Sequence, residues 1–286
     1  MVRGAERVID LKLPIERIRA LLNENTDASV TYAALEARLT LERVCYDRLR
    51  QCHDYISHSD LKKWQPNQVM NILINEVDEH AAETRTLSIG REPVVDGVEP
   101  IDADYVDIGT TIGFDPKLIG KMWNALAGLA LHVHLPTHKR DQISNYGNRD
   151  QITAKVEEVL VELERISGTT IGFTGFGEEV SFECDWCGTK IRRRASLLRE
   201  QQSISCINAD CKASWTTHKQ GEDFTFRPHT ANVKCEKCAT GNLIPWRLVA
   251  ALKYDQTGSV HCRSCSHKNY FQWRLTQVRP DPIEAE

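Results

Sequence analysis

Apolar residues recur at helical spacing through most of the first 170 residues of the chain. Ile15, Ile18, Leu21 and Leu22 follow Pro14, and the fixed φ of proline suits the first turn of a helix. Residues 30 to 65 contain no glycine or proline. Apolar side chains recur there at spacings of three, four and seven: Leu35, Leu39, Leu41, Val44, Cys45, Leu49 and Cys52. This pattern predicts one long amphipathic helix.

Three later segments carry similar helix signals. Pro66 opens a shorter segment whose apolar residues are Val69, Ile72, Leu73 and Val77. Asp115 and Pro116 are typical of an N-cap and a first helical position, so a helix is expected from there through residue 134. A further helix is expected from about residue 150 to residue 166, before Gly168.

Two segments lack apolar residues at helical spacing. Residues 86–114 combine β-branched residues with repeated proline, glycine and acidic positions, which predicts short strands or an irregular loop. Residues 169–183 predict a turn, at the glycine-rich GFTGFGEEV, and then a strand.

Charge divides the chain into two parts. Residues 1–183 contain 20 Lys/Arg against 30 Asp/Glu, whereas residues 184–286 contain 16 against 10. A composition shift of this kind indicates a domain boundary. We therefore expect an α+β protein with a mainly helical domain at 1–170, which carries a strand or loop insertion near 86–114, and two small β-rich modules at 171–232 and 233–278. Residues 279–286 are expected to be a disordered tail.

Eight of the ten cysteines occur in close pairs within the C-terminal part. The pairs are Cys184 with Cys187, Cys206 with Cys211, Cys235 with Cys238, and Cys262 with Cys265. Two thiolates on a tight turn can bind one metal ion together with two thiolates from a returning hairpin. The order of pairs, linkers and following aromatic residues is similar in the two halves, which predicts two copies of one module.

The four pairs resemble the zinc ribbon, a superfamily of small β-rich modules with four cysteine ligands. The resemblance covers roughly residues 182 to 274 and implies two structural zinc ions held by the eight cysteines. Because four thiolates complete a tetrahedral coordination shell, catalysis by the metal is not expected. His261 and His267 lie beside the second set of ligands and are interpreted as bystanders. The pair Cys206 and Cys211 departs from the usual ribbon pattern, with four intervening residues instead of two.

Basic and aromatic residues are interleaved with these pairs. The candidate nucleic-acid contacts are Trp186, Lys190, Arg192, Arg193, Arg194, Arg199, Trp246 and Arg247. Residues 184–279 contain 16 basic and 7 acidic residues. The net charge of this region stays positive after the negative charge of two zinc–thiolate sites is included. Arginine contacts with phosphate, together with stacking of bases on the aromatic rings, would bind nucleic acid with little dependence on its sequence. In the alternative interpretation the arginines face solvent or pair with the acidic N-terminal domain, while Trp215 and Trp273 form the module cores.

Two groups of histidines are candidate sites in the helical part. Arg48 and His53 form an R-x4-H pattern that resembles the HEPN superfamily, helical bundles that include metal-independent RNases using such a pair. The sequence lacks the polar residue that often follows the arginine, because Leu49 stands there. The alternative is that both are ordinary solvent-facing helix residues. The second group is His132, His134 and His138. On a strand, His132 and His134 would share one side and could hold a metal ion, and a general-base role is also considered. The alternative is that the histidines simply interact with the C-terminal dipole of a helix.

Neither a nucleotide-binding glycine loop nor a G-x-S-x-G or H-E-x-x-H motif is present. The first residues lack a secretory signal pattern, and no run approaches the roughly 18 apolar residues of a membrane span, so a cytoplasmic location is expected. The resulting hypothesis is a binding protein whose ribbons contact nucleic acid and whose helical domain mediates dimerisation or docking. The alternatives are a HEPN-like RNase and an adaptor that contacts only protein.

Overall fold

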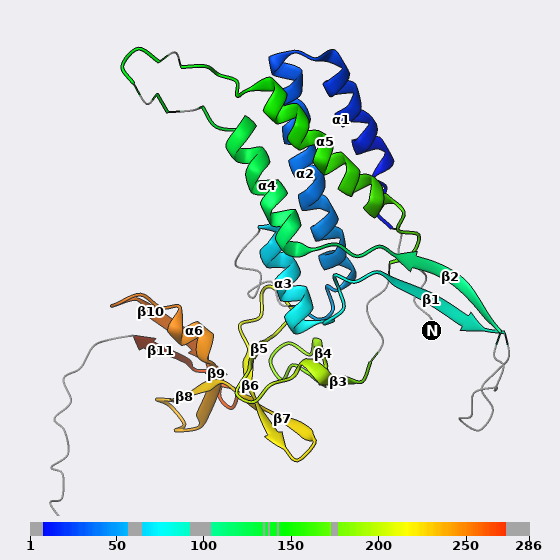
Figure 1. The fold of residues 1–286 in the computed structure, drawn as a ribbon. Coiled ribbons are helices and arrows are strands. Elements are labelled where there is room, and N and C mark those ends of the chain that lie inside the picture. The colour runs from blue at the N-terminus through cyan, green and yellow to red at the C-terminus, as the bar shows by residue number, and fades with distance from the viewer. Residues whose placement is uncertain are drawn as a thin grey trace, which may run out of the picture. The chain divides into compact units, whose positions relative to one another are not determined.

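The computed structural model describes residues 8–56, 65–91, 104–133, 135–136, 138–141, 143–172 and 177–272. The chain divides into two units. The first consists of Met1–Ile56, Leu61–Val180 and Arg193–Leu197, and the second of Ser57–Asp60, Ser181–Arg192 and Leu198–Glu286. Long helices fill the N-terminal part, up to residue 167, and small antiparallel sheets the C-terminal part (Figure 1), which confirms the α+β class. The predicted boundaries at 170, 232 and 278 stay predictions, and the expected tail lies outside the described residues.

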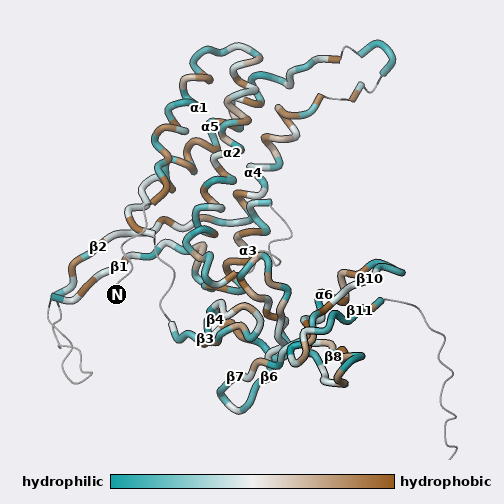
Figure 2. Tube along the Cα trace, turned by 180° about the vertical axis from the view of Figure 1, so that it is seen from behind, coloured by the Kyte–Doolittle hydropathy of each residue, from teal (hydrophilic) through white to brown (hydrophobic). Residues whose placement is uncertain are grey.

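Five helices form the body of the first unit. They are α1 (Lys12–Glu24), α2 (Asp27–Gln51), α3 (Pro66–Glu76), α4 (Pro116–Ala130) and α5 (Arg149–Ser167). Helix α2 contacts each of the other four, and Figures 1 and 2 show α1, α4 and α5 running alongside it. In the described parts of the chain, no helix has the length and apolar character needed to cross a membrane. The cytoplasmic location stays a prediction.

Local sequence signals fix where these helices begin. The Thr26 hydroxyl accepts from the backbone N–H of Ser29, and the Ser29 hydroxyl accepts from that of Thr26, each at 3.0 Å, which is a capping box. Asp115 accepts from the backbone N–H of Lys117 at 2.8 Å, and Pro66 is the first residue of α3. The predicted starts of α3 and α4 are confirmed.

The buried face of α2 matches the predicted one in the second half of the helix, where Leu41, Val44 and Cys45 are buried, and differs from it in the first half. Its contacts with the core are made largely by small residues, and Ala33, Ala34 and Ala37 are fully buried. Leu35 and Leu39, expected on the apolar face, are 36% and 49% exposed. A helix surrounded by several neighbours needs small side chains where the backbones approach closely, so Leu35 and Leu39 lie on the outer side.

The predicted strands near residues 86–114 form a hairpin. Strand β1 (Arg85–Gly90) pairs antiparallel with β2 (Tyr105–Thr111), with a register shift between Leu87 and Ser88. Residues 92–103 between the strands lie outside the described part of the chain. The backbone N–H of Thr170, just after α5, donates to the carbonyl of Thr110 at 2.8 Å, which ties the base of the hairpin to the end of the helix.

Four small sheets belong to the cysteine-rich region. Strands β3 (Glu179–Glu183) and β4 (Lys190–Arg194) form one pair, and β5 (Ser203–Ser205), β6 (Ser214–Gln220) and β7 (Asp223–Pro228) form a three-stranded sheet. The remaining pairs are β8 (Thr230–Lys234) with β9 (Gly241–Pro245) and β10 (Thr257–His261) with β11 (Lys268–Gln272), separated by the short helix α6 (Trp246–Ala250). Gly221, with φ of 67°, supplies the left-handed residue of the tight turn between β6 and β7.

Aromatic rings form the small core of the first cysteine module. The Phe182 ring meets the buried Trp215 ring edge-on at 5.0 Å between centroids and stacks with Phe226 at 4.5 Å. The core role predicted for Trp215 is confirmed, whereas Trp273 lies outside the described residues.

The last arginine of the run at 192–194 is paired inside the first unit. The Arg194 guanidinium donates to a carboxylate oxygen of Glu179 at 3.1 Å and to the carbonyl of Gly177 at 3.0 Å. It also lies over the Tyr55 ring, 5.1 Å from the centroid, and the Tyr55 hydroxyl donates to Glu179. The Arg194 side chain is only 9% exposed.

The substitution Arg194→Ala should lower the free energy of unfolding by about 2 kcal/mol, because it leaves the carboxylate and the carbonyl without their buried donor. Arg17→Ala is the matched control, since Arg17 pairs with Glu36 at 3.7 Å in an exposed position and should cost less than about 1 kcal/mol. Urea denaturation followed by circular dichroism measures both. Equal losses in the two variants would contradict the structural role of Arg194.

Candidate metal centres

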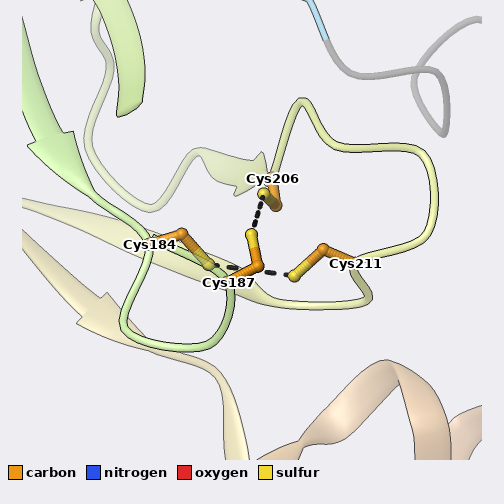
Figure 3. Close-up of side chains that lie close together, drawn as sticks. All are labelled: Cys184, Cys187, Cys206 and Cys211. Atoms are coloured by element: carbon orange, nitrogen blue, oxygen red, sulfur yellow. Dashed lines mark hydrogen bonds between the residues drawn. The ribbon is translucent and has the colours of Figure 1, made fainter. Parts of the chain in front are cut away.

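Four sulfur atoms converge in the first module. Cys184 and Cys187 lie in the turn between β3 and β4, while Cys206 follows β5 and Cys211 precedes β6. The Sγ atoms of Cys184 and Cys211 are 3.8 Å apart, and those of Cys187 and Cys206 are 3.6 Å apart. Figure 3 shows all four side chains pointing toward one centre.

The second module repeats this arrangement with the more usual spacing. Cys235 and Cys238 lie between β8 and β9, and Cys262 and Cys265 between β10 and β11. The Sγ atoms of Cys235 and Cys265, and those of Cys238 and Cys262, are 3.6 Å apart. In each module the four sulfurs lie within 4.8 Å of one another and are buried in the same order.

These separations fit a shared metal ion. A tetrahedral site with metal–sulfur bonds of about 2.3 Å places its sulfurs about 3.8 Å apart, whereas a disulfide would bring them to about 2.05 Å. Both four-cysteine groups can therefore hold a metal ion. Four thiolates complete its coordination, so the ion would organise the module and leave no position for a substrate. His261 and His267 belong to neither group of donor atoms.

Backbone hydrogen bonds give the first pair of each module the same turn. The N–H of Cys184 donates to the carbonyl of Thr189, and the N–H of Cys235 donates to that of Thr240, both at 2.9 Å. The residue after the second cysteine is left-handed in each case, Gly188 with φ of 71° and Ala239 with φ of 60°. Glycine adopts this conformation without strain, whereas alanine costs about 1 kcal/mol.

The pair Cys262 and Cys265 forms the same turn, with a left-handed residue after the second cysteine, and the pair Cys206 and Cys211 does not. Ser266 is left-handed with φ of 56°, and the N–H of Cys262 donates to the carbonyl of His267 at 2.8 Å. In the longer loop, the N–H of Cys211 donates to the carbonyl of Asn208 at 3.0 Å. This turn absorbs the additional residues and still brings both sulfurs to the site.

Threonine hydroxyls favour the thiolate form of the two most exposed ligands. The Cys187 sulfur lies 3.2 Å from the hydroxyl oxygen of Thr189, and the Cys238 sulfur lies 3.3 Å from that of Thr240. Burial raises the pKa of Cys187, but hydrogen bonding with Thr189 and with the sulfurs of Cys206 and Cys184 together outweighs it and brings the pKa to about 6. Hydrogen bonding with Thr240 lowers the pKa of Cys238. The thiolate is the form that binds metal.

Two buried asparagines cross-connect the pairs of the second module. Asn242, which follows the first pair, accepts at Oδ1 from the backbone N–H of Arg263 in the second pair at 3.0 Å. Asn269, which follows the second pair, accepts from the backbone N–H of Glu236 in the first pair at 2.9 Å. Their exposures are 2% and 1%. We call these two contacts the asparagine clasp.

The sequence analysis missed the clasp, although a signal was present. CEKCATGN and CRSCSHKN both read C-x2-C-x3-N, so each asparagine lies four residues after the second cysteine of its pair. The corresponding positions of the first module are Ile191 and Trp215. The clasp thus belongs to the second module, while the first relies on its aromatic core.

The candidate nucleic-acid contacts divide by burial. Lys190 and Arg199 are exposed, Trp186 is 38% exposed, and Arg192, Trp246 and Arg247 are half-buried. Arg193 and Arg194 are buried, at 4% and 7% exposure. The strand β4 therefore separates the basic run into outward and inward side chains.

The HEPN-like pair lies at the end of α2. Nη2 of Arg48 donates to the carbonyl of Ile112 at 2.9 Å, and burial lowers the pKa of Arg48. Helix α2 ends at Gln51, so His53 lies in the following turn, with an exposed side chain and its backbone N–H directed to Arg50. The expectation that both residues lie on the helix is therefore wrong for His53. Their catalytic role stays a prediction.

The histidines after α4 are only partly described. The helix ends at Ala130, and His132 and His138 are both exposed. The backbone N–H of His138 donates to the Asp141 carboxylate at 2.7 Å. His134 lies outside the described residues. Among the residues that the structure does describe, His132 and His138 join no group of candidate metal donors.

Comparisons with protein-family models, with curated proteins and with solved structures find no match to this chain. The assignment of the two centres therefore rests on their own geometry.

Metal removal should expose the cysteines in two stages. The purified protein should contain two metal ions per chain, and a strong chelator should release both and make the eight paired thiols reactive. Cys45 and Cys52 are buried in the helical core, and burial raises the pKa of Cys45 to about 12, so these two should react only after denaturant is added. Elemental analysis and thiol titration measure the two stages. Simultaneous reaction of all ten thiols would contradict this arrangement.

Loss of the asparagine clasp should weaken the second centre. Contacts that orient metal ligands typically contribute 10- to 100-fold to metal affinity, so Asn242→Ala and Asn269→Ala should each release one of the two metals about tenfold faster to a chromophoric chelator. Asn232→Ala, at an exposed position of β8, is the matched control. Unchanged release of both metals, or equal acceleration of release from both centres, would refute the clasp.

Proposed function

We propose that this chain is a two-zinc protein whose cysteine-rich modules bind nucleic acid and whose helical unit mediates dimerisation or docking. Zinc is the ion proposed for both centres because four-thiolate tetrahedral sites are typical of structural zinc. Modules of about 45 residues bury too little apolar surface to fold alone, and zinc supplies the missing free energy.

The observation that carries the nucleic-acid proposal is the set of exposed basic side chains in the second unit. Among the residues of this unit that the structure describes, the exposed Lys and Arg residues are Lys190, Arg199, Lys212, Lys219, Arg227, Lys234, Lys237, Lys253, Arg263 and Lys268. They outnumber the seven acidic residues of 184–279, and cationic side chains on a folded surface attract phosphate. The proposal omits Arg193 and Arg194, because buried guanidinium groups leave a phosphate no room to approach.

A row of apolar side chains on α2 supports the docking part of the proposal. Tyr32, Leu35 and Leu39, spaced by three and four residues, share one side of the helix and are 61%, 36% and 49% exposed. An exposed apolar row on a helix is typical of a surface that contacts another protein.

The substitutions Lys190→Ala and Arg199→Ala, made together, should reduce affinity for a labelled 20-nucleotide RNA or DNA about tenfold at 0.1 M salt. The slope of log K against log salt should become shallower by about two, since each lost phosphate contact contributes about 0.7 to 0.9. Lys117→Ala with Lys121→Ala, on exposed positions of α4, is the matched control. Fluorescence anisotropy over a salt series gives both quantities.

Binding that is insensitive to salt, or is weakened equally by the control pair, would contradict nucleic-acid recognition by the second unit. Complete absence of binding by the zinc-loaded chain would favour contact with protein alone. Inclusion of His53→Ala in the same assay, with cleavage of the RNA followed on a gel, tests the RNase hypothesis independently.

A further inference from the structure

A pocket lies within the second unit where its two modules meet. The first module contributes Asp185, Trp186 and Trp215, the second contributes Pro245 and Arg263, and the connecting residue His229 completes the wall. Trp186 lies between the metal ligands Cys184 and Cys187, and Arg263 lies between Cys262 and Cys265. The two candidate metal centres thus each present one turn to the same pocket.

The pocket has a volume of about 90 Å³. Sites for whole small-molecule ligands are typically about 300 Å³ or larger. The space therefore suits one ring or one side chain that belongs to a larger molecule lying outside it.

Short connections hold the two modules around this space. His229 is the single residue between β7 and β8. Its backbone N–H donates to the carbonyl of Ser214 at 2.7 Å, and its carbonyl accepts from the backbone N–H of Trp246 at 2.9 Å. The imidazole stacks on the Trp246 ring at 5.7 Å between centroids. The pocket is consequently preformed, which lowers the entropic cost of filling it.

The rim of the pocket combines an aromatic face with a cation. Trp186 is 38% exposed, and the Arg263 guanidinium lies 4.9 Å from the centre of the Trp186 ring. The Arg263 guanidinium covers one face of the Trp186 ring and would repel a second cation beside it, so lysine-like groups are poor occupants. A neutral planar ring attached to an anionic backbone meets both requirements, because the ring stacks on tryptophan and the anion pairs with arginine.

We propose that this pocket accepts one unpaired base of a single-stranded nucleic acid, stacked on Trp186, with the adjoining phosphate bound by Arg263. The inference rests on the proposed nucleic-acid function and specifies its substrate as single-stranded. A base within a duplex is already stacked on both faces, whereas an unpaired base is free to stack on a side chain. The Asp185 carboxylate accepts hydrogen bonds from the N–H groups on the base edge.

The test compares Trp186→Ala, Trp186→Phe and Arg263→Ala in the zinc-loaded full chain, with a labelled 12-nucleotide single strand and with its duplex. Stacking contributes about 1–3 kcal/mol per base, so Trp186→Ala should lower single-strand affinity about tenfold, with Trp186→Phe intermediate and duplex affinity unchanged. Trp186→Ala should leave the salt slope unchanged, whereas Arg263→Ala should make it shallower by about one. Tyr254→Ala, at a 69% exposed aromatic position outside the pocket, is the matched control.

A zinc content of two per chain verifies that each variant is folded. If wild type binds single strands and Trp186→Ala binds them equally well, the pocket proposal is overturned while the proposed function stands. If Trp186→Ala weakens duplex binding as much as single-strand binding, the single-strand specification is overturned. If wild type binds neither nucleic acid, both proposals fall, and a peptide side chain becomes the occupant to examine.

Discussion

The convergence of four cysteine sulfurs at about the edge length of a thiolate tetrahedron is the constraint on which the second unit depends. Thiolates at this distance repel one another strongly unless a cation lies between them. The surrounding strands are short, and the first module buries few large apolar side chains, chiefly Ile191, Ile204 and Trp215. With the proposed metal ions bound, folding and metal binding would be one equilibrium in these modules, because so small an apolar core would not replace the ion.

This constraint also explains where the basic residues lie. The turn that carries Cys184 and Cys187 returns as β4, in which Ile191 and Arg193 share one side, and Lys190, Arg192 and Arg194 share the other. Arg193 lies on the buried side with Ile191, whereas Arg194 shares the side of the exposed Lys190 and is buried by its contacts with Glu179 and Tyr55. One run of like charges thus combines a solvent-facing part with a structural part. For this reason, a basic residue that lies near a metal-binding cysteine in the sequence need not be available to bind a partner.

The sequence predicted those features that depend on local chemistry. Proline at the first turn of α3, the Asp115 cap of α4 and the cysteine pairs each act within a few residues, so their signals survive in any tertiary context. The features that it did not predict depend on distant partners. The outward position of Leu35 and Leu39 follows from the crowding of α2 by its neighbours, and the burial of Arg193 and Arg194 follows from the position of β4. The asparagine clasp joins residues more than 20 positions apart, so only the repeated spacing hints at it.

The direct passage from β7 through His229 to β8 has a consequence for how the two metal centres load. A flexible linker would let each module gain or lose its ion without affecting the other. Here the strand that ends one module is separated from the strand that begins the next by one residue, whose N–H and carbonyl are bonded to different modules. Collapse of either module would therefore remove hydrogen bonds that position the other, so occupancy of one centre favours occupancy of its neighbour. Two centres coupled in this way would respond more steeply to the free metal concentration than two independent sites.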